Sequence, residues 1–571
     1  MSEHNAENID FRNIKQILYN SVKLYGNNIA FSIKHQNDNN VYYENKTYRE
    51  FLEDINSFGA SLYYMGLKGA KIAIIGRNRY EWALAYLTNL LGGMISVPLD
   101  RELQLMELEE SLIRSGVKGL IFDGKYKELI DEVKKRNKTQ IEFYICMDYD
   151  RNFISMKKLI ENDKNKQVFI QEFINCNIDS KSMSVLLFTS GTTSKSKVVM
   201  LNQEGIAVNI QDMLKVEGFK ATDVNIAFLP FHHIFGSTGL LVMLASGIKN
   251  VFADGLRHIK HNMQEYKVSV FVGVPLLIDK MYQGIEKEIK RQGKEKLVKF
   301  GRKISKFMMR FNIDIRRRIF KDILDQLGGN LRLIISGGAP LEKSLAENFK
   351  EYGIDVVQGY GLTETSPVIS AEDIRHRKTG SVGVPMENTK VEIVNKDENG
   401  IGEIRVKGPN VMLGYYENQE VTNEVLEDGW FYTGDLAFID PEGYIFITGR
   451  KKDVIVLKNG KKAFPDELEI LVNKIPGVEE SFVYGKPENN DINDLVVSAK
   501  VVYNKDNIRD EYGEVSEKEL FEIIWNKIKE INKTLPRYKY IKNLILTNTP
   551  LIKTSTNKIK RNEELKLVLE N

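Results

Sequence analysis

The pattern of apolar and polar residues along the first third of the chain predicts strands and helices in alternation. A helical pattern covers residues 13–25, and Thr47 with Glu50 has the spacing of a capping box that opens a second helix, ending at Gly66. Strand-like runs lie at residues 29–33, 41–43 and 71–75. Alternation of this kind is typical of a mostly parallel sheet covered by helices, so the pattern predicts an α/β fold.

The most apolar stretch of the chain, residues 82–99, does not have the pattern of a membrane span. It is interrupted by Thr88, Asn89, Gly92, Gly93 and Pro98. Crossing a bilayer takes about 20 consecutive apolar residues. The pattern therefore predicts a buried helix that continues into a strand.

Two strand patterns in the second half of the chain end in glycine-rich turns. Residues 331–335 lead into Ser336-Gly-Gly-Ala-Pro340, and the next strand ends in Gln358-Gly-Tyr-Gly-Leu-Thr-Glu-Thr365. Ligands of open α/β sheets bind beyond the carboxyl ends of the strands. We expect the two turns to form a slot thin enough for a purine, with Tyr360 able to stack on it.

Residues 284–322 combine basic and apolar side chains at helical spacing, which puts much of the apolar set on one side of a helix. The basic residues include Lys296, Lys299, Lys303, Lys306 and Arg310, and the apolar ones include Leu297, Phe300, Ile304, Phe307 and Phe311. A basic amphipathic helix can lie on an anionic membrane surface. A solvated helix pair packed on the protein has the same pattern, and the sequence leaves both interpretations open.

Residues 452–571 have the pattern of a small, separate α+β domain. A strand at residues 454–457 is followed by a turn at Asn459-Gly460 and a helix from Pro465. Ser516 and Glu519 form a second capping box. Strands are expected near Ser481 and Val496.

Composition limits the function classes. The chain has 571 residues, and 81 Lys and Arg against 78 Asp and Glu leave a net charge of +3, so bulk charge predicts no nucleic-acid partner. Cys146 and Cys176 lack metal-ligand spacing and are expected to be buried free thiols in a reducing compartment. The polar N-terminus lacks a signal-peptide pattern. A cytoplasmic protein is expected, with peripheral contact at the inner face of the membrane through residues 284–322 as an open alternative.

One loop has the composition of a phosphate-binding site. The apolar run Val185–Phe188 stops at Thr189-Ser190-Gly191-Thr192-Thr193-Ser194-Lys195-Ser196-Lys197. Hydroxyl groups and close backbone N–H groups can donate to phosphate oxygens, and lysine adds positive charge. A polar surface loop would have a similar composition. The loop is not a Walker loop, because G-x-x-x-x-G-K-[ST] is absent.

This loop resembles the signature T-S-G-T-T-G-x-P-K-G of the adenylate-forming superfamily, which includes acyl-CoA synthetases, luciferases and peptide-synthetase adenylation domains. Thr189, Ser190, Gly191, Thr192, Thr193 and Lys197 match the signature. Ser194, Ser196 and Val198 stand where Gly, Pro and Gly are usual. The departures affect the distal half of the loop and leave its phosphate-donating half intact.

Other motifs of the superfamily follow in the expected order. By resemblance, Glu364 takes the place of the Mg²⁺ carboxylate, Thr363 of an α-phosphate contact and His233 of the side chain that gates the carboxylate site. The adenine site corresponds to Gly338, Ala339, Pro340, Gly359, Tyr360 and Gly361. Asp435 and Arg450 match the ribose-binding pair, although as isolated residues they could equally form a structural ion pair. Lys558 matches the catalytic lysine, with Asn557 in place of the common Gly and Lys553 as a weaker candidate.

The resemblance implies a fold and a reaction. The fold is a large N-terminal domain, residues 1–451, of stacked α/β subdomains with a distorted β-barrel, followed by a mobile C-terminal lid domain, residues 452–571, with the hinge at Lys452. The insertion at 284–322 looks like that of long-chain enzymes, so the implied reaction is activation of a long-chain fatty acid by ATP and Mg²⁺ and transfer to coenzyme A. The catalytic set would be Lys558, Glu364, Thr189 and His233.

Alternatives remain at this stage. The acid could be medium-chain or aryl, and the acceptor could be an acyl carrier protein. A protein that binds a nucleotide or acyl group without catalysis is the alternative from another class, motivated by the loop departures and by Asn557. The sequence does not determine the oligomeric state.

Overall fold

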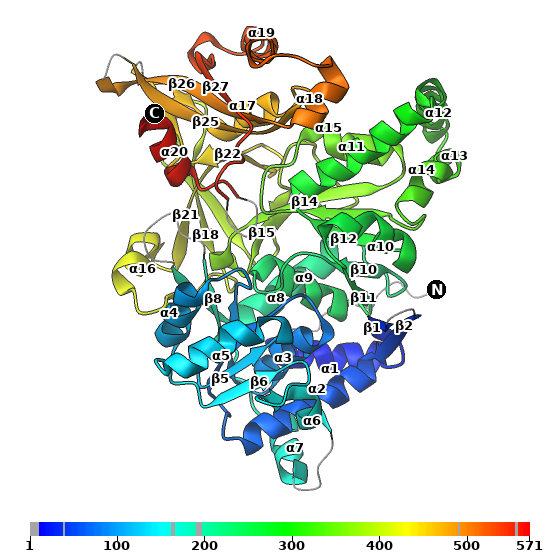
Figure 1. The fold of residues 1–571 in the computed structure, drawn as a ribbon, viewed down its shortest axis with the longest axis vertical. Coiled ribbons are helices and arrows are strands. Elements are labelled where there is room, and N and C mark those ends of the chain that lie inside the picture. The colour runs from blue at the N-terminus through cyan, green and yellow to red at the C-terminus, as the bar shows by residue number, and fades with distance from the viewer. Residues whose placement is uncertain are drawn as a thin grey trace. The chain divides into compact units, whose positions relative to one another are not determined.

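The computed structural model describes residues 11–37, 40–161, 166–189, 197–458, 460–488, 491–553 and 558–570. These residues form two compact units (Figure 1). The first comprises Met1–Thr189, Lys197–Val391 and Val406–Phe431, and the second includes Glu392–Arg405 and Tyr432–Asn571. Each unit is described separately.

An eight-stranded sheet in the first unit has the order β19-β9-β8-β4-β3-β5-β6-β7. Its strands are β3 (Lys71–Ile75), β4 (Ile95–Leu99), β5 (Gly119–Phe122), β6 (Phe143–Cys146), β7 (Ile154–Ser155), β8 (Met183–Phe188), β9 (Val198–Asn202) and β19 (Gly414–Tyr415). The central strand β3 runs parallel to β4 and β5. Ile72 and Ile74 of β3 face one apolar cluster, whereas Ala73 and Ile75 face another, so both faces of this sheet are buried.

A second sheet of the first unit has the order β16-β15-β14-β13-β12-β10-β11-β1-β2. Its strands are β1 (Ile29–Asn37), β2 (Asn40–Thr47), β10 (Val224–Ala227), β11 (Lys249–Phe252), β12 (Val270–Gly273), β13 (Leu333–Ser336), β14 (Asp355–Gly361), β15 (Val368–Ala371) and β16 (Val384–Pro385). Val270 and Val272 belong to the same apolar cluster as Ile72, and Phe271 belongs to a third cluster. The two sheets therefore share one central core.

Helices fill the layer between the sheets and cover their outer faces (Figure 1). The central core contains residues of α1 (Ile14–Tyr25), α2 (Tyr48–Tyr64), α3 (Tyr80–Leu91), α8 (Gln203–Val216) and α9 (Ile234–Ala245). The outer face of the eight-stranded sheet packs on α4 (Leu105–Ser115) and α5 (Lys127–Arg136). The outer face of the other sheet packs on α10 (Ile259–Tyr266), α11 (Pro275–Arg291), α14 (Lys321–Gln326) and α15 (Lys343–Glu351). The arrangement is that of stacked α/β subdomains.

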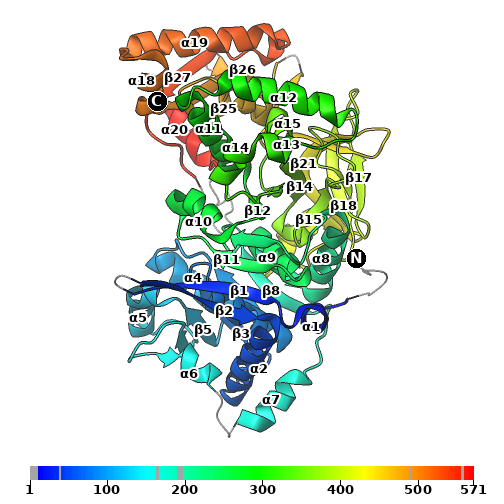
Figure 2. The ribbon, with the colours of Figure 1, turned by 90° about the vertical axis from the view of Figure 1, so that its right-hand side faces the viewer.

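The remaining helices of the first unit are shorter or lie farther from the central core. They are α6 (Met156–Ile160), α7 (Gln167–Ile174), α12 (Glu295–Met309), α13 (Arg316–Ile319) and α16 (Gln419–Val425). Of these, α12 lies on the outside of the unit beside α13 (Figure 2).

The second unit contains the small α+β domain. Its sheet of β25 (Val478–Glu488), β26 (Asp491–Tyr503) and β27 (Asn543–Thr547) carries the helices α17 (Pro465–Val472), α18 (Lys505–Tyr512), α19 (Glu517–Lys533) and α20 (Arg561–Glu570). Val483 faces the core with α17 and α19, and its neighbours Phe482 and Tyr484 face Val568 of α20. A two-stranded ribbon consists of β23 (Ile455–Val456) and β24 (Lys462–Ala463).

One further sheet stands where the resemblance predicts a distorted β-barrel. It has the order β17-β18-β21-β20, with β22 paired to β21. The strands are β17 (Lys390–Val394), β18 (Gly402–Lys407), β20 (Leu426–Glu427), β21 (Trp430–Ile439) and β22 (Ile445–Arg450). The strand order is that of an open sheet.

Local predictions from the sequence are confirmed at several points. Thr47 and Glu50 form the predicted capping box at the start of α2, and Ser516 with Glu519 does so at α19. Residues 82–99 form the end of α3 and all of β4. The turn predicted at Asn459-Gly460 lies only partly within the described residues, because Asn459 is outside them.

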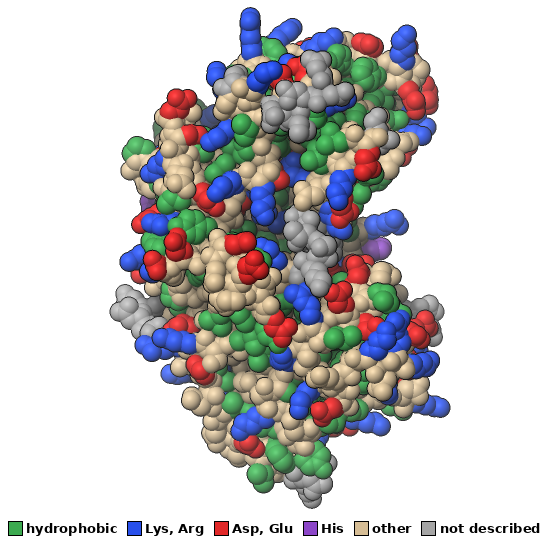
Figure 3. All heavy atoms as spheres, turned by 90° about the vertical axis from the view of Figure 1, so that its left-hand side faces the viewer, with side chains coloured by type: hydrophobic (Ala, Val, Ile, Leu, Met, Phe, Trp, Pro, Cys, Tyr) green, Lys and Arg blue, Asp and Glu red, His purple; other side chains and the backbone are tan. Residues whose placement is uncertain are grey.

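The described surface agrees with a nearly balanced composition. On the face in Figure 3, acidic and basic side chains are interspersed. A search of the described helices finds none with the length and apolarity that crossing a bilayer requires.

Candidate functional site

Strands β8 and β9 fix the two ends of the predicted phosphate loop. The Thr189 backbone N–H donates to the Lys197 carbonyl at 2.9 Å, and the Thr189 hydroxyl donates to the same oxygen at 3.2 Å. These bonds continue the antiparallel ladder in which Phe188 pairs with Val198. Thr189 and Lys197 therefore occupy the base of the loop. The predicted donors Ser190, Gly191, Thr192 and Thr193 lie outside the described residues.

Tyr415 connects Lys197 with Glu364. The Tyr415 hydroxyl donates to Glu364 Oε1 at 2.9 Å, and Lys197 Nζ lies 4.5 Å from the centroid of the same ring. Only 5% of Tyr415 is exposed. Burial and the neighbouring Glu364 carboxylate raise the pKa of Tyr415 well above its usual value, so the hydroxyl stays protonated and donates.

The position of Tyr415 follows from strand pairing. Tyr415 pairs with Val199 in the β19–β9 ladder, only two residues from Lys197. Gly414 has a φ of +136°, and a Cβ there would lie 2.9 Å from Thr422 Cγ2, so glycine is required before the tyrosine. Sequence reasoning missed Tyr415, because its partners lie 51 and 218 residues away and no local pattern marks the pairing.

The main chain also holds Glu364. Glu364 lies in a short 3-10 turn, Thr363–Thr365, that follows β14, and its carbonyl accepts a bond from the Met412 N–H at 2.8 Å. The Tyr415 hydroxyl uses one acceptor position of Glu364 Oε1 and leaves the other carboxylate positions for a further ligand. Carboxylate oxygen is a hard ligand, and Mg²⁺ in nucleotide sites usually takes one or two carboxylates together with phosphate oxygens. The donor type and its fixed orientation fit Mg²⁺.

The two glycine-rich turns lie side by side at one edge of the second sheet. Strands β13 and β14 are parallel neighbours, with Ser336 opposite Gln358. The Gln358 side chain accepts a bond from the Leu341 N–H at 3.2 Å, which links the turns. The sheet thus brings together the predicted residues Gly338, Ala339, Pro340, Gly359, Tyr360 and Gly361.

Glycine is sterically required in both turns. Gly338 has a φ of +82°, in the left-handed region. A Cβ on Gly361 would lie 1.9 Å from the Pro367 carbonyl oxygen. A side chain at either position would displace the backbone.

His233 stands at the start of α9 beside a second histidine. The His232 and His233 rings have centroids 4.2 Å apart, and His232 Nε2 lies 3.3 Å from Asp100 Oδ1. Asp100 directly follows β4, so a strand end supplies the carboxylate. Ligand-type atoms of Asp100, His232 and His233 all lie within 4.8 Å of one another. Sequence reasoning named only His233; the doubled histidine and the aspartate after a strand were the available signals.

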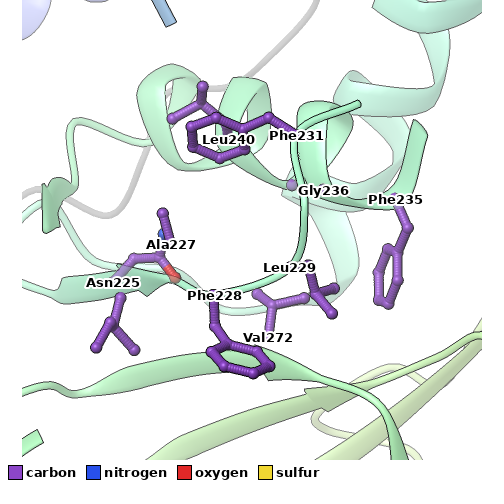
Figure 4. A pocket seen from close by; sticks show the side chains of 11 residues that line it. Asn225, Ala227, Phe228, Leu229, Phe231, Phe235, Gly236, Leu240 and Val272 are labelled. Atoms are coloured by element: carbon purple, nitrogen blue, oxygen red, sulfur yellow. The ribbon is translucent and has the colours of Figure 1, made fainter. Parts of the chain in front are cut away.

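A largely apolar cavity of about 20 Å³ lies between β10 and the start of α9, and its lining includes residues on both sides of His233 in the sequence but not His233 itself (Figure 4). Phe231, Phe235 and Leu240 contribute to its lining, together with Phe228 and Leu229. This volume accommodates about one water molecule. Gly239 also lines the cavity, and a Cβ there would meet no atom within 4 Å.

In the second unit, β21 and β22 place Asp435 opposite Arg450. The two residues are paired in the ladder, and Asp435 Oδ1 lies 3.2 Å from Arg450 Nε. Asp435 is buried, while Arg450 is more than half exposed. The next residue, Lys451, pairs with Glu403 at 2.8 Å. The predicted pair is therefore in contact.

Lys558 is exposed on the segment that leads into α20. Lys553 and Ile559 pair in an isolated antiparallel β-bridge. Arg561 anchors the segment to the domain through Asp466 at 2.8 Å and Glu469 at 2.6 Å. Burial raises the pKa of Glu469 to about 7 in spite of Arg561, so loss of the guanidinium would leave a poorly solvated carboxyl.

Family comparisons match both parts of the chain. Residues 21–416 match the AMP-binding enzyme family, and residues 452–568 match the AMP-binding enzyme C-terminal domain. The second match begins at Lys452, whereas the compact units of the structure divide at residue 431.

Three of the similar curated proteins are named as fatty acid ligases. A long-chain-fatty-acid–CoA ligase of Escherichia coli is 27% identical, covering 77% of this chain and 78% of its own. Long-chain-fatty-acid–CoA ligase 5 of Rattus norvegicus is 30% identical, covering 77% and 69%. A chloroplastic long-chain-fatty-acid–[acyl-carrier-protein] ligase of Arabidopsis thaliana is 24% identical, covering 85% and 76%.

Solved structures share the fold at low identity. An anthranilate CoA ligase in complex with anthranoyl-AMP superposes with a TM-score of 0.76 at 19% identity, covering 99% of both chains. An O-succinylbenzoate coenzyme A synthetase from Bacillus subtilis, in complex with ATP and magnesium, gives 0.71 at 22% identity, covering 97% and 99%. Because the family match covers more than half of the chain and both parts of the fold, the protein belongs to the AMP-binding enzyme family and is an adenylate-forming acid–thiol ligase.

Proposed function

We propose that the protein activates a long-chain fatty acid with ATP and then transfers the acyl group to coenzyme A. The observation that carries this proposal is that Tyr415 contacts both Lys197 and Glu364. An ammonium for phosphate and a carboxylate for a divalent cation are thereby held on one side chain. A protein that only bound an acyl group would have no use for this pair.

In the first half-reaction, a carboxylate oxygen of the acid attacks the α-phosphorus of ATP. The bond from that phosphorus to the bridging oxygen breaks, and pyrophosphate leaves. Negative charge accumulates on the phosphoryl oxygens, where Lys197 and the ammonium of Lys558 would stabilise it, together with the Thr189 hydroxyl once it turns away from the Lys197 carbonyl. Thr363, in the 3-10 turn that follows β14, would contact the α-phosphate.

The phosphate groups also need a divalent cation. Glu364 would hold Mg²⁺, because its carboxylate is oriented by Tyr415 and by its own backbone. Bound Mg²⁺ supplies positive charge next to the phosphate oxygens. Tyr415 acts through Glu364 and is a positioning residue.

The predicted ribose pair and the two glycine-rich turns would each bind one part of the nucleoside. A ribose diol offers two hydroxyl donors, and the buried Asp435 carboxylate accepts such bonds while Arg450 balances its charge. The turns at Gly338–Pro340 and Gly359–Gly361 leave a surface of backbone and small side chains, against which a purine can lie, with Tyr360 beside it.

In the second half-reaction, the thiol of coenzyme A attacks the acyl carbonyl carbon of the adenylate. The bond from that carbon to the phosphate oxygen breaks, and AMP leaves. His233, at the start of α9, would face the acyl carboxylate, and the nearby apolar cavity would take the start of the acyl chain. The cavity holds only about one water molecule, so an acyl chain requires the lining side chains to move.

The long-chain assignment and the acceptor rest on different support. The relatives in Escherichia coli and Rattus norvegicus are named as long-chain-fatty-acid–CoA ligases, and the lining of the cavity at the start of α9 is largely apolar. The relative in Arabidopsis thaliana is named as a ligase for acyl carrier protein, so this acceptor is the second candidate.

One assay tests acid and acceptor together. Pyrophosphate release is measured with ATP, Mg²⁺ and carboxylic acids from acetate to palmitate, including benzoate, with coenzyme A, with acyl carrier protein or with neither. We expect turnover only with a long acyl chain and coenzyme A. Turnover with benzoate would reject the long-chain assignment, and turnover only with carrier protein would change the acceptor. If folded protein released no pyrophosphate with any of these acids, the proposed function would be contradicted.

A further inference from the structure

Helix α12, inside the basic insertion, carries large apolar side chains that no other part of the described chain covers. Leu297, Phe300, Ile304 and Phe307 project from the helix, and Phe311 follows just beyond its end. Phe300 is 61% exposed and Phe307 is 56% exposed. The spacing of three and four residues aligns the five side chains on one stripe. Figure 2 shows α12 on the outside of its unit.

The orientation of this apolar stripe is fixed by the opposite face of the helix. Gly301 and Ser305 are buried, and a Cβ on Gly301 would lie 2.9 Å from Ile319 Cγ2. Arg302 pairs with Glu286 at 3.1 Å and with Glu351 at 3.0 Å. The helix cannot rotate to bury its phenylalanines without breaking these contacts.

A second stripe on α12 is basic. Lys296, Lys299, Lys303, Lys306 and Arg310 each directly precede one residue of the apolar stripe. None of the five lies within 4.0 Å of a carboxylate of the described residues, in contrast to Arg302 on the packed face. Glu295 is the sole acidic residue from position 295 to 310. The helix therefore presents uncompensated positive charge beside exposed aromatic side chains.

We propose that α12 docks on the surface of an anionic lipid bilayer. Phenylalanine and leucine side chains favour the boundary between headgroups and acyl chains, and lysines on the flank pair with anionic headgroups. Lysine stems extend along the apolar surface while the ammonium groups stay at headgroup level. Charge selects this partner over a second copy of the chain, because two α12 helices in contact would bring two basic stripes together.

The docking is parallel to the membrane surface. The 15 residues of α12 include four lysines and an arginine, which excludes a spanning orientation for this helix. Only the apolar stripe enters the lipid, and the packed face with Arg302 stays on the protein. The proposal does not depend on the proposed catalytic function, because it involves none of the residues assigned to it.

Vesicle co-sedimentation of the full chain tests the docking. Vesicles of phosphatidylglycerol and phosphatidylcholine are compared with vesicles of phosphatidylcholine alone, at low and high salt. We expect binding to the anionic vesicles that weakens as salt rises, because screening shortens the reach of the lysine charges. Phe300→Ser combined with Phe307→Ser should lower the partition coefficient about tenfold or more. Lys299→Glu, Lys303→Glu and Lys306→Glu combined should abolish the preference for anionic lipid.

A matched triple variant controls for net charge. Lys505→Glu, Lys518→Glu and Lys533→Glu change the net charge by the same amount as the α12 triple variant. The three lysines are exposed, the first in α18 and the other two in α19, and the variant should leave vesicle binding unchanged. Circular dichroism and thermal melting establish that each variant is folded. Absence of binding by the wild type, equal loss in the control triple, or a dimer that the phenylalanine variant converts to a monomer would overturn the proposal.

Discussion

Tyr415 is the residue on which the orientation of the Glu364 carboxylate depends. Tyr415→Phe removes the hydroxyl that donates to Glu364 Oε1 at 2.9 Å and keeps the ring near Lys197. We expect the adenylation rate to fall by about tenfold or more, as for other residues that orient metal ligands. The Mg²⁺ concentration for half-maximal rate should rise at the same time. Pyrophosphate release across a Mg²⁺ titration measures both.

The neighbouring tyrosine provides the control for this prediction. The Tyr416 hydroxyl accepts a bond from Lys71 at 2.8 Å and does not contact Glu364 in the described structure. Tyr416→Phe should therefore leave the Mg²⁺ dependence unchanged. An unaltered Mg²⁺ requirement in Tyr415→Phe would show that the hydroxyl does not position the metal ligand.

Glu217 makes folding stability depend on pH. The residue caps the C-terminus of α8 and is almost fully buried, and burial together with Glu372 and Asp373 raises its pKa from 4.5 to about 8. Since the folded state holds the proton more tightly than the unfolded state, its stabilising contribution is complete below pH 4.5 and is lost as the pH rises toward 8.

Glu217→Gln should remove this dependence. We expect the variant to be more stable than the wild type at pH 8, by on the order of a few kcal/mol, and about equal to it near pH 4.5. Urea unfolding at several pH values measures the difference. The exposed Glu424→Gln is the control and should show none of it. A constant difference across pH would contradict the assignment.

The sequence predicts individual residues best where function leaves a local pattern. Glu364, Asp435 and Lys558 stand in short motifs, and the structure places Asp435 against Arg450 as the motif order implies. Tyr415 makes its contacts because β19 pairs with the distant β9, and Asp100 meets His232 only because the two sheets pack together. The spacing of residues within one segment cannot show contacts with a distant segment, so these two residues could be identified only from the structure.

At the scale of elements, α9 forms one wall of the apolar cavity. Gly239 lies on this helix at the apolar cavity, and a Cβ there meets no atom within 4 Å. The Cβ of Gly239→Leu therefore meets no atom, and the rest of the leucine side chain, which is larger than the cavity, would occupy it and block its opening. If the cavity opens to admit the acyl chain, the variant should lower kcat/KM for palmitate by about tenfold or more while activity with short acids is kept.

A second helical glycine is the control for this change. Gly284 of α11 is exposed, and a Cβ there also meets no atom within 4 Å. Gly284→Leu makes the same substitution away from the cavity and should not change the preference for chain length. Equal loss on short and long acids in Gly239→Leu would mean that the cavity is not the acyl site.

Elements illustrate both the reach and the limit of sequence patterns. The capping boxes of α2 and α19 form as predicted, because each depends on two residues three positions apart. Helical periodicity also indicates the helix at residues 295–309. It does not determine which face of α12 packs inward, because both Gly301–Ser305 and Phe300–Phe307 have helical spacing. Small residues pack against the protein there, and the large apolar ones are exposed.

At the scale of the whole molecule, the family match and the compact units place the boundary before the small domain differently. The C-terminal family match begins at Lys452, whereas residues 432–451 group with the second compact unit. The resemblance implies that the hinge is at Lys452. In the structure, Arg450 to Asp453 form a tight turn in which the Asp453 N–H donates to the Arg450 carbonyl at 3.0 Å.

Lys452→Pro tests whether rotation at this turn is needed between the two half-reactions. Proline fixes φ at this residue and restricts the residue before it. If the small domain rotates about Lys452 after adenylation, the variant should keep pyrophosphate release in a single turnover and lose most of the transfer to coenzyme A. The two half-reactions are measured separately, by burst pyrophosphate and by acyl-CoA formation from preformed adenylate. Lys452→Ala, which keeps backbone freedom, should retain both. Equal loss of adenylation and of transfer to coenzyme A in the proline variant would contradict a hinge at Lys452. Residues 432–451 would then be expected to move as part of the second unit.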